Sequence, residues 1–432
     1  MKRKILYCTH AFPGDLYSEK VFITPDLEAL RRHFDEIVLL PSEPISRDKG
    51  YYRRLPDGVS VDWSFADDTI FHSKLLKSVY IFHPYVLRSA VMIAGEARTP
   101  AQWIKGIFQA INTARLSAVL RRVLRRHDMK PSDTLFMSMW FHDPAAALAR
   151  VAGKGGFAMA TRAHTSDIFD EAMLFRSRRI RSRLLRAVDK VFSISRLGYD
   201  YFVARFPEHA GRFVHAPLGS IRLFSPTAPD AVDESSITPS AAPSEISFMT
   251  VARLDPIKRI DLILDVLAEV ALALPDTRIN YTLIGDGECE ESLAAKAAAL
   301  KPRNLNVSMT GTLENEEIQR RLATASPDWY IMMSSTEGLP VSMGEAMSYG
   351  VPVITTDVGQ ISELVTPECA LMLPADARPA EYRDMMLPVI TDGAVRRRMA
   401  AAALKRWEDT FDARSLASGV AETLAGLLPQ TK

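Results

Sequence analysis

Short apolar runs alternate with amphipathic helical patterns along the whole 432-residue sequence, and this alternation constrains the fold more than any other feature. Strands separated by helices form parallel sheets, because each helix carries the chain back across the sheet before the next strand begins. The alternation therefore predicts an α/β protein with a doubly wound parallel sheet in each half. The apolar runs that we interpret as strands are residues 4–7, 36–40, 134–137 and 191–194 in the first half and 246–251, 280–284, 329–332 and 351–354 in the second.

A segment without periodicity separates the two halves. Residues 225–245 are rich in Pro, Ala, Ser, Thr and Asp, a composition typical of linkers. We therefore expect two Rossmann-like domains that face each other across an interdomain cleft. Their expected limits are 1–218 for the N-terminal domain, 219–245 for the linker, 246–404 for the C-terminal domain, and 405–432 for a C-terminal helix that packs back towards the N-terminal domain.

Composition excludes several classes of protein. A hydrophobic fraction of 47% and a charged fraction of 24% are typical of a globular protein and not of a disordered or fibrous one. The longest apolar stretch, residues 79–94, is interrupted by His83, Pro84 and Arg88, so it does not reach the roughly 20 apolar residues that a spanning helix needs. The three cysteines lie far apart, which argues against a disulfide framework or a zinc site and favours a reducing cytoplasm.

Charge is distributed unevenly between the halves. Residues 1–222 hold 35 Lys and Arg against 22 Asp and Glu, whereas residues 223–432 hold 18 against 30. The first part therefore carries a formal charge of +13 and the second −12, although the whole chain carries only +1. A basic half indicates a polyanionic partner, an anionic membrane surface or docking against the acidic half, and composition leaves all three open.

The most informative motif follows the expected strand at 329–332. A loop that contains Glu337 leads into a helix whose first turn we expect near Ser342, with Glu345 inside that turn. Ligands bind at the carboxyl edge of such sheets, and the free N–H groups of a helix N-terminus bind anions such as a diphosphate. Two carboxylates beside that anion suit recognition of sugar and ribose hydroxyl groups. A second interpretation stays open for Glu345, because Ser342-x-x-Glu345 has the spacing of a capping box that needs no ligand.

A second cluster follows the expected strand at 246–251. It places Arg253 in a loop and Lys258 in the expected first turn of a helix that Asp255 caps, with Pro256 at its first position. Cations at a helix N-terminus oppose the helix dipole, so their presence there indicates an anion between them. A lone Arg or Lys is usually a solvated surface residue, but these two share a sheet edge with the Glu337 loop. We therefore interpret both as anion-binding residues.

Glycine turns end two further strands of the second half. Gly285 belongs to a Gly-Asp-Gly turn that lacks the third glycine of a dinucleotide fingerprint, which disfavours hydride transfer. Gly311 and Thr312 follow another strand end, where we expect them to approach a nucleotide base.

Together these motifs resemble the retaining glycosyltransferases of family 4, which have the GT-B architecture of two facing Rossmann-like domains. The resemblance covers residues 246–365 and extends more weakly over most of the chain. Glu337 and Glu345 have the spacing of that family's E-x7-E motif, and Arg253 and Lys258 match its basic pair. The resemblance implies that the C-terminal domain binds a nucleotide sugar and the N-terminal domain the acceptor.

The resemblance also implies a role for each donor-side residue. Glu337 would contact the transferred sugar, Glu345 the ribose hydroxyl groups, and the basic pair the diphosphate. The loop backbone would contact the diphosphate as well, although Pro340 has no N–H and only shapes the loop. The loop residues concerned are Gly338, Leu339, Pro340 and Val341.

In the first half, residues 161–169 resemble the family segment whose histidine approaches the donor sugar. His164 is therefore our candidate for positioning the reacting sugar, and Asp167 is an acceptor-side candidate. Many relatives have paired glycines after the first strand, whereas this sequence has only Gly14, which we also assign to the acceptor side. This segment and residues 12–22 are similar to bacterial exopolysaccharide and colanic-acid-type transferases.

Breaking the bond between a sugar and a nucleoside diphosphate builds negative charge on the leaving group. Arg253, Lys258 and a helix N-terminus would stabilise that charge without a metal ion. The sequence offers no convincing Asp-x-Asp metal motif and no convincing nucleophile. We expect no metal and no cofactor, a nucleoside-diphosphate sugar as co-substrate and, as the resemblance implies, retention of the anomeric configuration.

The arginines of the first half bear on the acceptor and the location. Residues 115–126 form a helix with an apolar face (Leu116, Val119, Leu120, Val123 and Leu124) and five arginines, and residues 176–186 hold six more. The first helix either packs on its own domain with a solvated basic side or lies on a membrane surface. The arginine runs lack the interleaved aromatic residues of nucleic-acid-binding segments. We expect a glycan or lipid-linked glycan acceptor in surface polysaccharide biosynthesis, contact with an anionic membrane, a cytoplasmic location at its inner face, and no nucleic-acid partner.

Other functions would use the same architecture. A sugar-nucleotide epimerase of the GT-B fold would act on the donor without an acceptor, and a non-catalytic scaffold would bind the sugar nucleotide without transfer. The presence of all four charged residues argues against the scaffold. A phosphorylase would need a lysine that holds pyridoxal phosphate, and the sequence reveals no such lysine.

Overall fold

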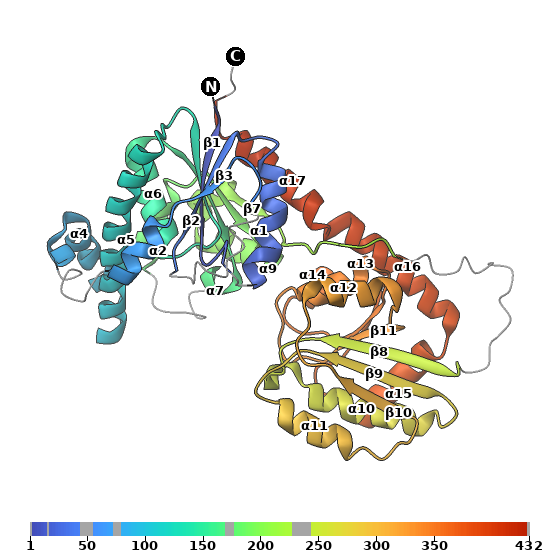
Figure 1. The fold of residues 1–432 in the computed structure, drawn as a ribbon. Helices are drawn as coiled ribbons and strands as arrows, with labels where there is room; N and C mark the ends of the chain where they lie inside the picture. The colour runs from blue at the N-terminus through green and yellow to red at the C-terminus, as the bar shows by residue number, and fades with distance from the viewer. Residues whose placement is uncertain are drawn as a thin grey trace. The chain divides into compact units, whose positions relative to one another are not determined.

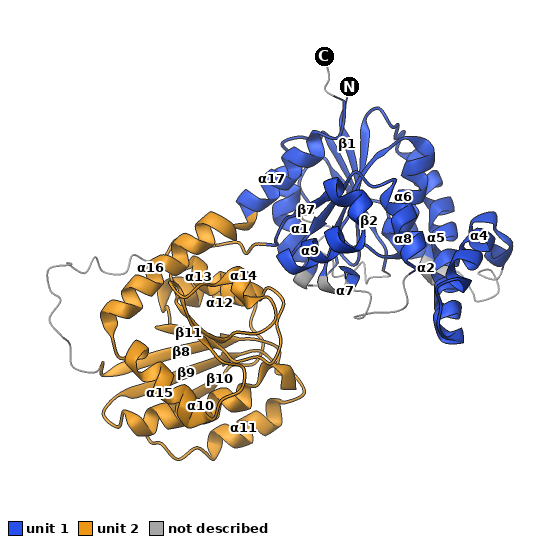
Figure 2. Cartoon of the chain, turned by 180° about the vertical axis from the view of Figure 1, so that it is seen from behind, with its two compact units in different colours: residues 1–218, 414–432 blue, residues 219–413 orange. Residues whose placement is uncertain are grey.

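Two compact units make up the protein (Figure 2). The first comprises residues 1–218 and 414–432, and the second residues 219–413. Of the expected linker, residues 227–242 lie outside the described residues, and so does Arg176 at the start of the second arginine run. The structure is a computed structural model that describes residues 2–14, 17–43, 55–71, 79–168, 177–226 and 243–429.

The first unit contains a seven-stranded parallel sheet (Figure 1). Its strand order is β3-β2-β1-β4-β5-β6-β7, so the chain first builds outward from β1 in one direction and then, from β4, in the other. The strands are β1 (Lys4–Thr9), β2 (Glu36–Pro41), β3 (Val59–Val61), β4 (Thr134–Ser138), β5 (Ala158–Ala163), β6 (Lys190–Ser193) and β7 (Phe213–His215).

Helices cover both faces of this sheet. They are α1 (Tyr17–Leu30), α2 (Ser64–Phe71), η2 (Tyr80–Phe82), α4 (Pro84–Ala94), α5 (Pro100–Arg126), α6 (Asp143–Gly155), α7 (Thr165–Ile168), α8 (Arg178–Leu185), α9 (Arg196–Arg205), η3 (Pro207–Arg212) and α17 (Ala413–Ala425). Leu6 and Cys8 of β1 join the core under α2, α5, α6 and α9, whereas Ile5 and Tyr7 join the core under α1 and α17. The strand period of two residues thus sorts the side chains into two helical layers.

The second unit repeats this plan with six parallel strands in the order β10-β9-β8-β11-β12-β13, the order of the dinucleotide-binding fold. The strands are β8 (Glu245–Val251), β9 (Arg278–Ile284), β10 (Leu305–Met309), β11 (Trp329–Met332), β12 (Val353–Thr356) and β13 (Ala370–Leu373). The helices are η5 (Pro256–Lys258), α10 (Ile260–Ala273), α11 (Glu290–Ala298), α12 (Asn315–Thr324), α13 (Val341–Ser348), α14 (Ile361–Leu364), α15 (Pro379–Ile390) and α16 (Gly393–Thr410). Phe248 packs under α10 and α15, and the next residue, Met249, packs under α12 and α13.

The predicted α/β class with two parallel-sheet, Rossmann-like domains is confirmed. The eight predicted strands correspond to β1, β2, β4, β6, β8, β9, β11 and β12. Five strands were not predicted because polar residues interrupt their apolar pattern or because they are short. Strand β5, for example, contains the buried Arg162, and β10 alternates with Asn306 and Ser308.

The chain ends in two helices that belong to different units. Helix α16 belongs to the second unit and contributes Ala403 and Trp407 to its core. Helix α17 belongs to the first unit, where Val420 and Leu424 pack into the same core as Tyr7. The first unit is therefore built from two separate stretches of the chain.

The apolar face of residues 116–124 lies inside the first unit. All five of its apolar side chains are buried in the core against the sheet. Arg115 is also buried and forms an ion pair with Asp68. Of the two interpretations left open by the sequence, packing on its own domain is the correct one for this face. Among the described residues, no helix is both long and apolar enough to cross a membrane.

A buried ion pair joins β5 to α1 in the first unit. The Arg162 guanidinium donates to both carboxylate oxygens of Asp26, at 2.7 and 3.2 Å, and the Tyr7 hydroxyl donates to the same carboxylate at 2.7 Å. All three residues are at most 5% exposed. Removal of one partner leaves a buried charge unpaired, which costs far more than the loss of an exposed pair.

We expect Arg162→Ala to lower the free energy of unfolding by about 3–5 kcal/mol, because it leaves Asp26 buried without its cation. The matched control is Lys130→Ala, which removes an exposed pair with Asp128 at 3.2 Å and should cost no more than about 1 kcal/mol. Urea unfolding of the full chain measures both values. Equal losses in the two variants would contradict a special role for the buried pair.

Candidate functional site

The loops after β8 and β11 meet at the carboxyl edge of the second sheet. These two strands are neighbours in the sheet, and the connections that leave them run to opposite sides, which is the position where open α/β sheets bind ligands. The backbone N–H of Ser335 donates to the carbonyl oxygen of Ile257 at 2.8 Å and ties the two loops together. The sequence-based expectation that both loops share one edge is therefore correct.

Lys258 and Glu337 form an ion pair across these loops. The Lys258 Nζ atom lies 2.5 Å from Glu337 Oε1, and the two side chains are 17% and 8% exposed. The Ser334 hydroxyl donates to the same carboxylate oxygen at 2.6 Å. Of the four charged candidates, the structure thus brings Lys258 and Glu337 together. Both are partly buried, and charges interact more strongly there than in water.

The N-terminus of α13 lies directly beside this pair. The helix begins at Val341 after Pro340, and Pro340 provides no side-chain cap. Within the described residues, the backbone N–H groups of Gly338, Leu339 and Val341 have no hydrogen-bond acceptor. Free amides at a helix start favour a negatively charged group.

Glu345 does not form the alternative capping box. The Ser342 hydroxyl donates to the Val251 carbonyl oxygen at 2.9 Å and so joins α13 to the end of β8. The Glu345 carboxylate instead accepts from Asn315 at 2.7 Å and Gln319 at 3.3 Å on α12. Glu345 is 4% exposed, and burial raises its pKa to about 7 although both amides act in the opposite direction.

Arg253 lies apart from the ion pair. Its guanidinium donates to Asp255 at 2.6 Å, and its side chain is 72% exposed. The helix start also differs from the expectation: residues 256–258 form the short 3-10 helix η5, Arg259 then adopts a left-handed conformation with φ of 50°, and α10 begins only at Ile260. Lys258 therefore precedes α10 and does not lie in its first turn.

Glycines let the loops at this edge pack backbone against backbone. A side chain at Gly285 would collide with the Ala252 carbonyl group, and one at Gly287 would collide with Leu254, so the β9 turn supports the Arg253 loop. A side chain at Gly359 would collide with the Glu337 carbonyl oxygen, which also accepts from the Gln360 N–H at 3.0 Å. These glycines have a structural role that the sequence did not reveal.

The remaining donor-side candidates lie on the same edge. The Gly285 N–H donates to the Gly311 carbonyl oxygen at 2.9 Å, so the β9 and β10 turns are joined. Gly311 has a positive φ of 68°, and Thr312 is exposed beside it.

In the first unit, His164 lies at the carboxyl end of β5. Its ring is 6% exposed and stacks on Trp140, with ring centroids 3.9 Å apart. Burial lowers the pKa of His164 to about 4, so the imidazole is neutral at neutral pH. Its Nε2 atom lies 3.0 Å from the Met139 carbonyl oxygen, which can only accept, so Nε2 carries the proton and Nδ1 is left as an acceptor.

A buried carboxylate holds the loop after β1 next to this ring pair. Glu19, which is fully buried, accepts backbone N–H bonds from His10, Ala11 and Phe12 at 2.6 to 2.9 Å. The same carboxylate accepts from the Trp140 indole at 2.7 Å. Glu19 thereby fixes both the β1 loop and the aromatic ring on which His164 stacks.

The two acceptor-side candidates of the first unit are buried. Asp167 is 1% exposed, and its carboxylate accepts from the backbone of Phe141 at 2.9 Å and of His164 at 3.3 Å. Gly14 is also buried, and its N–H donates to the Ala11 carbonyl oxygen at 2.8 Å. Through these backbone hydrogen bonds, both residues stabilise the conformation of the loops in which they lie.

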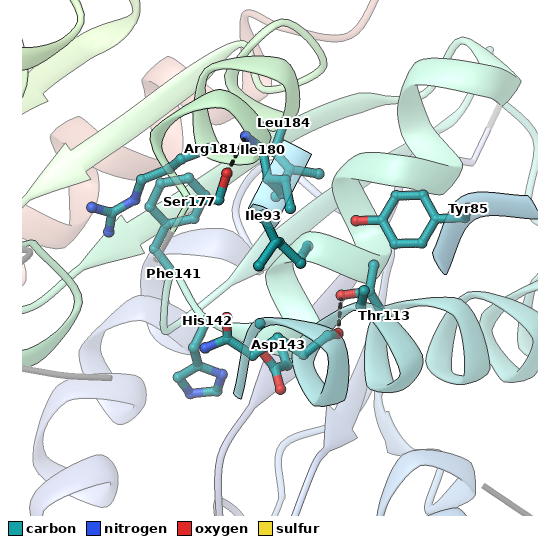
Figure 3. Close-up of a pocket in the computed structure, with 14 residues that line it drawn as sticks. Tyr85, Ile93, Thr113, Phe141, His142, Asp143, Ser177, Ile180, Arg181 and Leu184 are labelled. Carbon is teal, nitrogen blue, oxygen red and sulfur yellow. Dashed lines mark hydrogen bonds between the residues drawn. The ribbon is translucent and has the colours of Figure 1, made fainter. Parts of the chain in front are cut away.

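A pocket lies next to the carboxyl edge of the first sheet, between α4, α5, α6 and α8 (Figure 3). It has a volume of about 70 Å³. Phe141, His142 and Asp143, which follow β4, form one wall, while Ile93 of α4 and Leu184 of α8 line it from the helical side. The pocket therefore extends from the strand ends towards the α4–α5 region.

Some of the residues around His164 could be recognised from the sequence as residues at the edge of a sheet. Trp140 and His142 follow directly after a predicted strand, and aromatic and polar residues at that place mark the carboxyl edge of a sheet. Glu19 had no such signal, because it lies on a helix and acquires its partners only through tertiary packing. Among the residues that the structure describes, no three His, Cys, Asp or Glu side chains gather as a metal site would require.

Comparison with known proteins agrees with this fold. Residues 245–392 match the family model described as "Glycosyl transferases group 1". A GDP-mannose-dependent monoacylated alpha-(1-6)-phosphatidylinositol monomannoside mannosyltransferase of Corynebacterium glutamicum is 28% identical over 279 residues, which are 62% of this chain and 70% of that protein.

Solved structures of the same architecture cover nearly the whole chain. The lipopolysaccharide outer core galactosyltransferase WaaB has a TM-score of 0.64 at 16% identity, over 97% of this chain and 99% of that one. The HepE protein of Anabaena in complex with UDP has a TM-score of 0.63 at 17% identity, over 98% of this chain and 100% of that one. At these identities the likeness shows the fold alone.

Together the fold, the matched domain and the relatives define an enzyme that transfers glycosyl groups. The chain is a glycosyltransferase of the GT-B fold, similar to family 4, as the sequence motifs predicted.

The raised pKa of Glu345 predicts a pH dependence of stability. Between about pH 4.5 and pH 7 the folded protein holds a proton on Glu345 that the unfolded chain has lost, so this group makes stability fall as pH rises through that window, by about 3 kcal/mol in total. Glu345→Gln should remove this component, because an amide does not titrate, while its oxygen can still accept from Asn315. Urea unfolding of both proteins between pH 5 and pH 8 measures the difference, and parallel pH profiles would refute the assignment.

Proposed function

We propose that the chain is a retaining, metal-independent glycosyltransferase that needs no cofactor. It moves a sugar from a nucleoside-diphosphate sugar, bound by the second unit, to a glycan or lipid-linked glycan acceptor, bound by the first unit. The observation that carries the donor site is the Lys258–Glu337 ion pair, 2.5 Å long, beside the free amides at the start of α13. The proposed setting is surface polysaccharide biosynthesis at the inner face of the membrane.

The donor fits these groups by charge. Lys258 and the free N–H groups of Gly338 and Leu339 would bind the diphosphate, whose two negative charges compete with Glu337 for the lysine. The released Glu337 carboxylate would then accept hydrogen bonds from the sugar hydroxyl groups. Arg253 is exposed on the same edge and would leave Asp255 to contact the diphosphate. Gly311 and Thr312 would lie near the base.

Glu345 would accept hydrogen bonds from the ribose. Its carboxylate already accepts from two amides of α12, so its position is fixed before the donor arrives. Hydroxyl donors favour the ionised form of a carboxylate, so donor binding would lower the pKa of Glu345 from about 7.

Catalysis in this proposal rests on leaving-group stabilisation. As the bond between sugar and diphosphate breaks, negative charge grows on the β-phosphate, and Lys258, Arg253 and the α13 amides would oppose it. These groups do the work that a metal ion performs in other transferases. The acceptor hydroxyl would attack from the face that the leaving group vacates, which retains the anomeric configuration.

In the first unit, neutral His164 would position the reacting sugar. Its Nδ1 atom is an acceptor, since Nε2 donates to Met139, and an acceptor suits a sugar hydroxyl group. Trp140 and Glu19 hold the ring in place. Asp167 and Gly14 would act on the acceptor side by shaping the surrounding loops.

One comparison supports a lipid-linked acceptor. The mannosyltransferase of Corynebacterium glutamicum acts, by its name, on an acylated phosphatidylinositol mannoside. The pocket next to His142, with Ile93 and Leu184 in its wall, offers partly apolar space for such an acceptor.

We expect Lys258→Ala to lower kcat/KM for release of nucleoside diphosphate by about 100- to 1000-fold, as loss of one preorganised charge does in other enzymes. UDP-glucose and GDP-mannose are the donors to test first. Glu337→Gln should reduce the rate as well, because a neutral amide binds sugar hydroxyl groups less well. Lys296→Ala is the control, since it removes a lysine that pairs with Asp265 on the outer helices. If neither Lys258→Ala nor Glu337→Gln changed kcat/KM for release of nucleoside diphosphate, the proposed site would be wrong.

Retention predicts the stereochemistry of the product. With an α-linked donor, NMR of the first product formed should show an α-linkage, because the acceptor attacks on the face of the leaving group. An inverted product would refute the retaining mechanism and leave the donor-site assignment intact.

A further inference from the structure

Exposed large apolar side chains gather in one region of the first unit. Of twelve such side chains on the described surface, eight lie between residues 79 and 108. In α4, Leu87 and Val91 are 51% and 75% exposed, and in α5, Ile104 and Phe108 are 48% and 57% exposed. The other four are Val79, Ile81, Phe82 and Trp103. An exposed apolar surface of this extent marks an interaction site.

The helical spacing arranges these side chains in outward stripes. Leu87 and Val91 are four residues apart, as are Ile104 and Phe108, so each pair lies on one side of its helix. The inner sides of α4 and α5 pack together through a small core of Val86, Ala110, Ile111 and Ala114. Within the first unit, α4 and one end of α5 stand away from the sheet in both views (Figures 1 and 2). We call residues 79–108 the apolar projection.

Cations accompany the apolar projection. It carries Arg88, Arg98 and Lys105, all exposed, against a single acid, Glu96. Helix α8 packs against α4 and brings the second arginine run to the same place. A groove of about 670 Å³ lies there, lined by Met92 and Glu96 of the projection together with Arg178, Arg179, Ser182, Arg183, Arg186 and Glu208.

The two acids of this groove already have partners in the protein. Glu96 accepts from the Arg179 backbone N–H at 3.2 Å, and Glu208 accepts from the Ser182 hydroxyl at 2.9 Å. Arg179 also lies 3.7 Å from Glu96, but four arginines outnumber two glutamates in the lining, so the groove presents a surplus of positive charge directly beside exposed apolar side chains.

The combination of exposed apolar and basic side chains favours an anionic lipid bilayer as the binding partner of this surface. Apolar stripes beside a cationic rim suit the interface of an anionic lipid bilayer, where apolar side chains enter the acyl boundary and arginines meet phosphate groups. A second copy of the chain would set the arginines of one subunit against those of the other, because a two-fold interface pairs a surface with itself. A nucleic acid would match the arginines and leave the apolar stripes exposed to water.

We propose that the apolar projection and the α8 arginines form the surface by which the protein docks on an anionic membrane. This deepens the proposed function, on which it rests for the choice of a lipid-linked acceptor. The pocket in Figure 3 lies directly behind the projection, since Ile93 of α4 and Gly106 of α5 belong to its wall, and His142 lines it as well. Docking by this surface would bring an acceptor from the bilayer to the strand ends.

The test is sedimentation of the full chain with vesicles. Wild-type protein should bind vesicles of phosphatidylglycerol and phosphatidylcholine at low salt, bind pure phosphatidylcholine weakly, and dissociate as the salt concentration rises. Val91→Ser/Phe108→Ser should weaken binding by about tenfold or more, since two apolar side chains are lost from the interface. Arg178→Gln/Arg183→Gln should weaken binding only to the anionic vesicles.

Matched controls separate this surface from general effects. Leu223→Ser/Leu272→Ser removes two exposed leucines of the second unit, 45% and 63% exposed, and should bind as wild type does. Release of nucleoside diphosphate from UDP-glucose or GDP-mannose without vesicles should be unchanged in Val91→Ser/Phe108→Ser, because these residues lie far from the donor edge in sequence and belong to the other unit.

The outcomes are distinct for the docking surface and the proposed function. Vesicle binding that Val91→Ser/Phe108→Ser leaves intact would overturn the docking surface, and so would a wild-type dimer that this variant dissociates without any vesicle binding. Loss of vesicle binding in a protein that releases no nucleoside diphosphate from any donor would support the docking surface and count against the transferase proposal.

Discussion

The close approach of four loops at one sheet edge is the constraint on which the proposed donor site depends. Gly285, Gly287 and Gly359 have no side chain, and the backbones of neighbouring loops occupy the space that a Cβ would need. The bond from Ser335 to the Ile257 carbonyl oxygen completes this backbone framework. Lys258 and Glu337 can therefore meet at 2.5 Å although 79 residues separate them in the sequence. The charged groups would carry the proposed chemistry, and the glycines set where those groups lie.

Periodicity alone was sufficient to predict the architecture. Runs such as residues 246–251 and 329–332 are apolar on both faces, as strands covered by helices on both sides must be, and they became β8 and β11. Because parallel strands end at a common edge, the sequence also predicted that Lys258 and Glu337 would lie on that edge. The strands that were missed, such as β5 with its buried Arg162, carry polar side chains whose partners lie elsewhere in the chain.

Other features could not be predicted because they arise from contacts between distant segments. The sequence spacing suggested that Glu345 and Ser342 form a capping box. In the structure the Glu345 carboxylate instead accepts a hydrogen bond from α12, and the Ser342 hydroxyl donates to the end of β8. The Glu19 carboxylate accepts hydrogen bonds from three backbone amides and one indole, and no sequence pattern connects these groups to Glu19. The apolar face of α5 gave a correct helix, but only packing shows that residues 116–124 are buried while Ile104 and Phe108 of the same helix are exposed.

Helix α17 gives the first unit an unusual dependence on the rest of the chain. Its Val420 and Leu424, with Leu428 just beyond the helix, complete the core that contains Tyr7, but the ribosome synthesises them after all of residues 219–413. Domains generally fold in the order in which they emerge during synthesis. Of the two units, the one that is started first is finished last, so until α17 has been synthesised the core that α17 shares with α1 stays incomplete and open to chaperones or to misassembly.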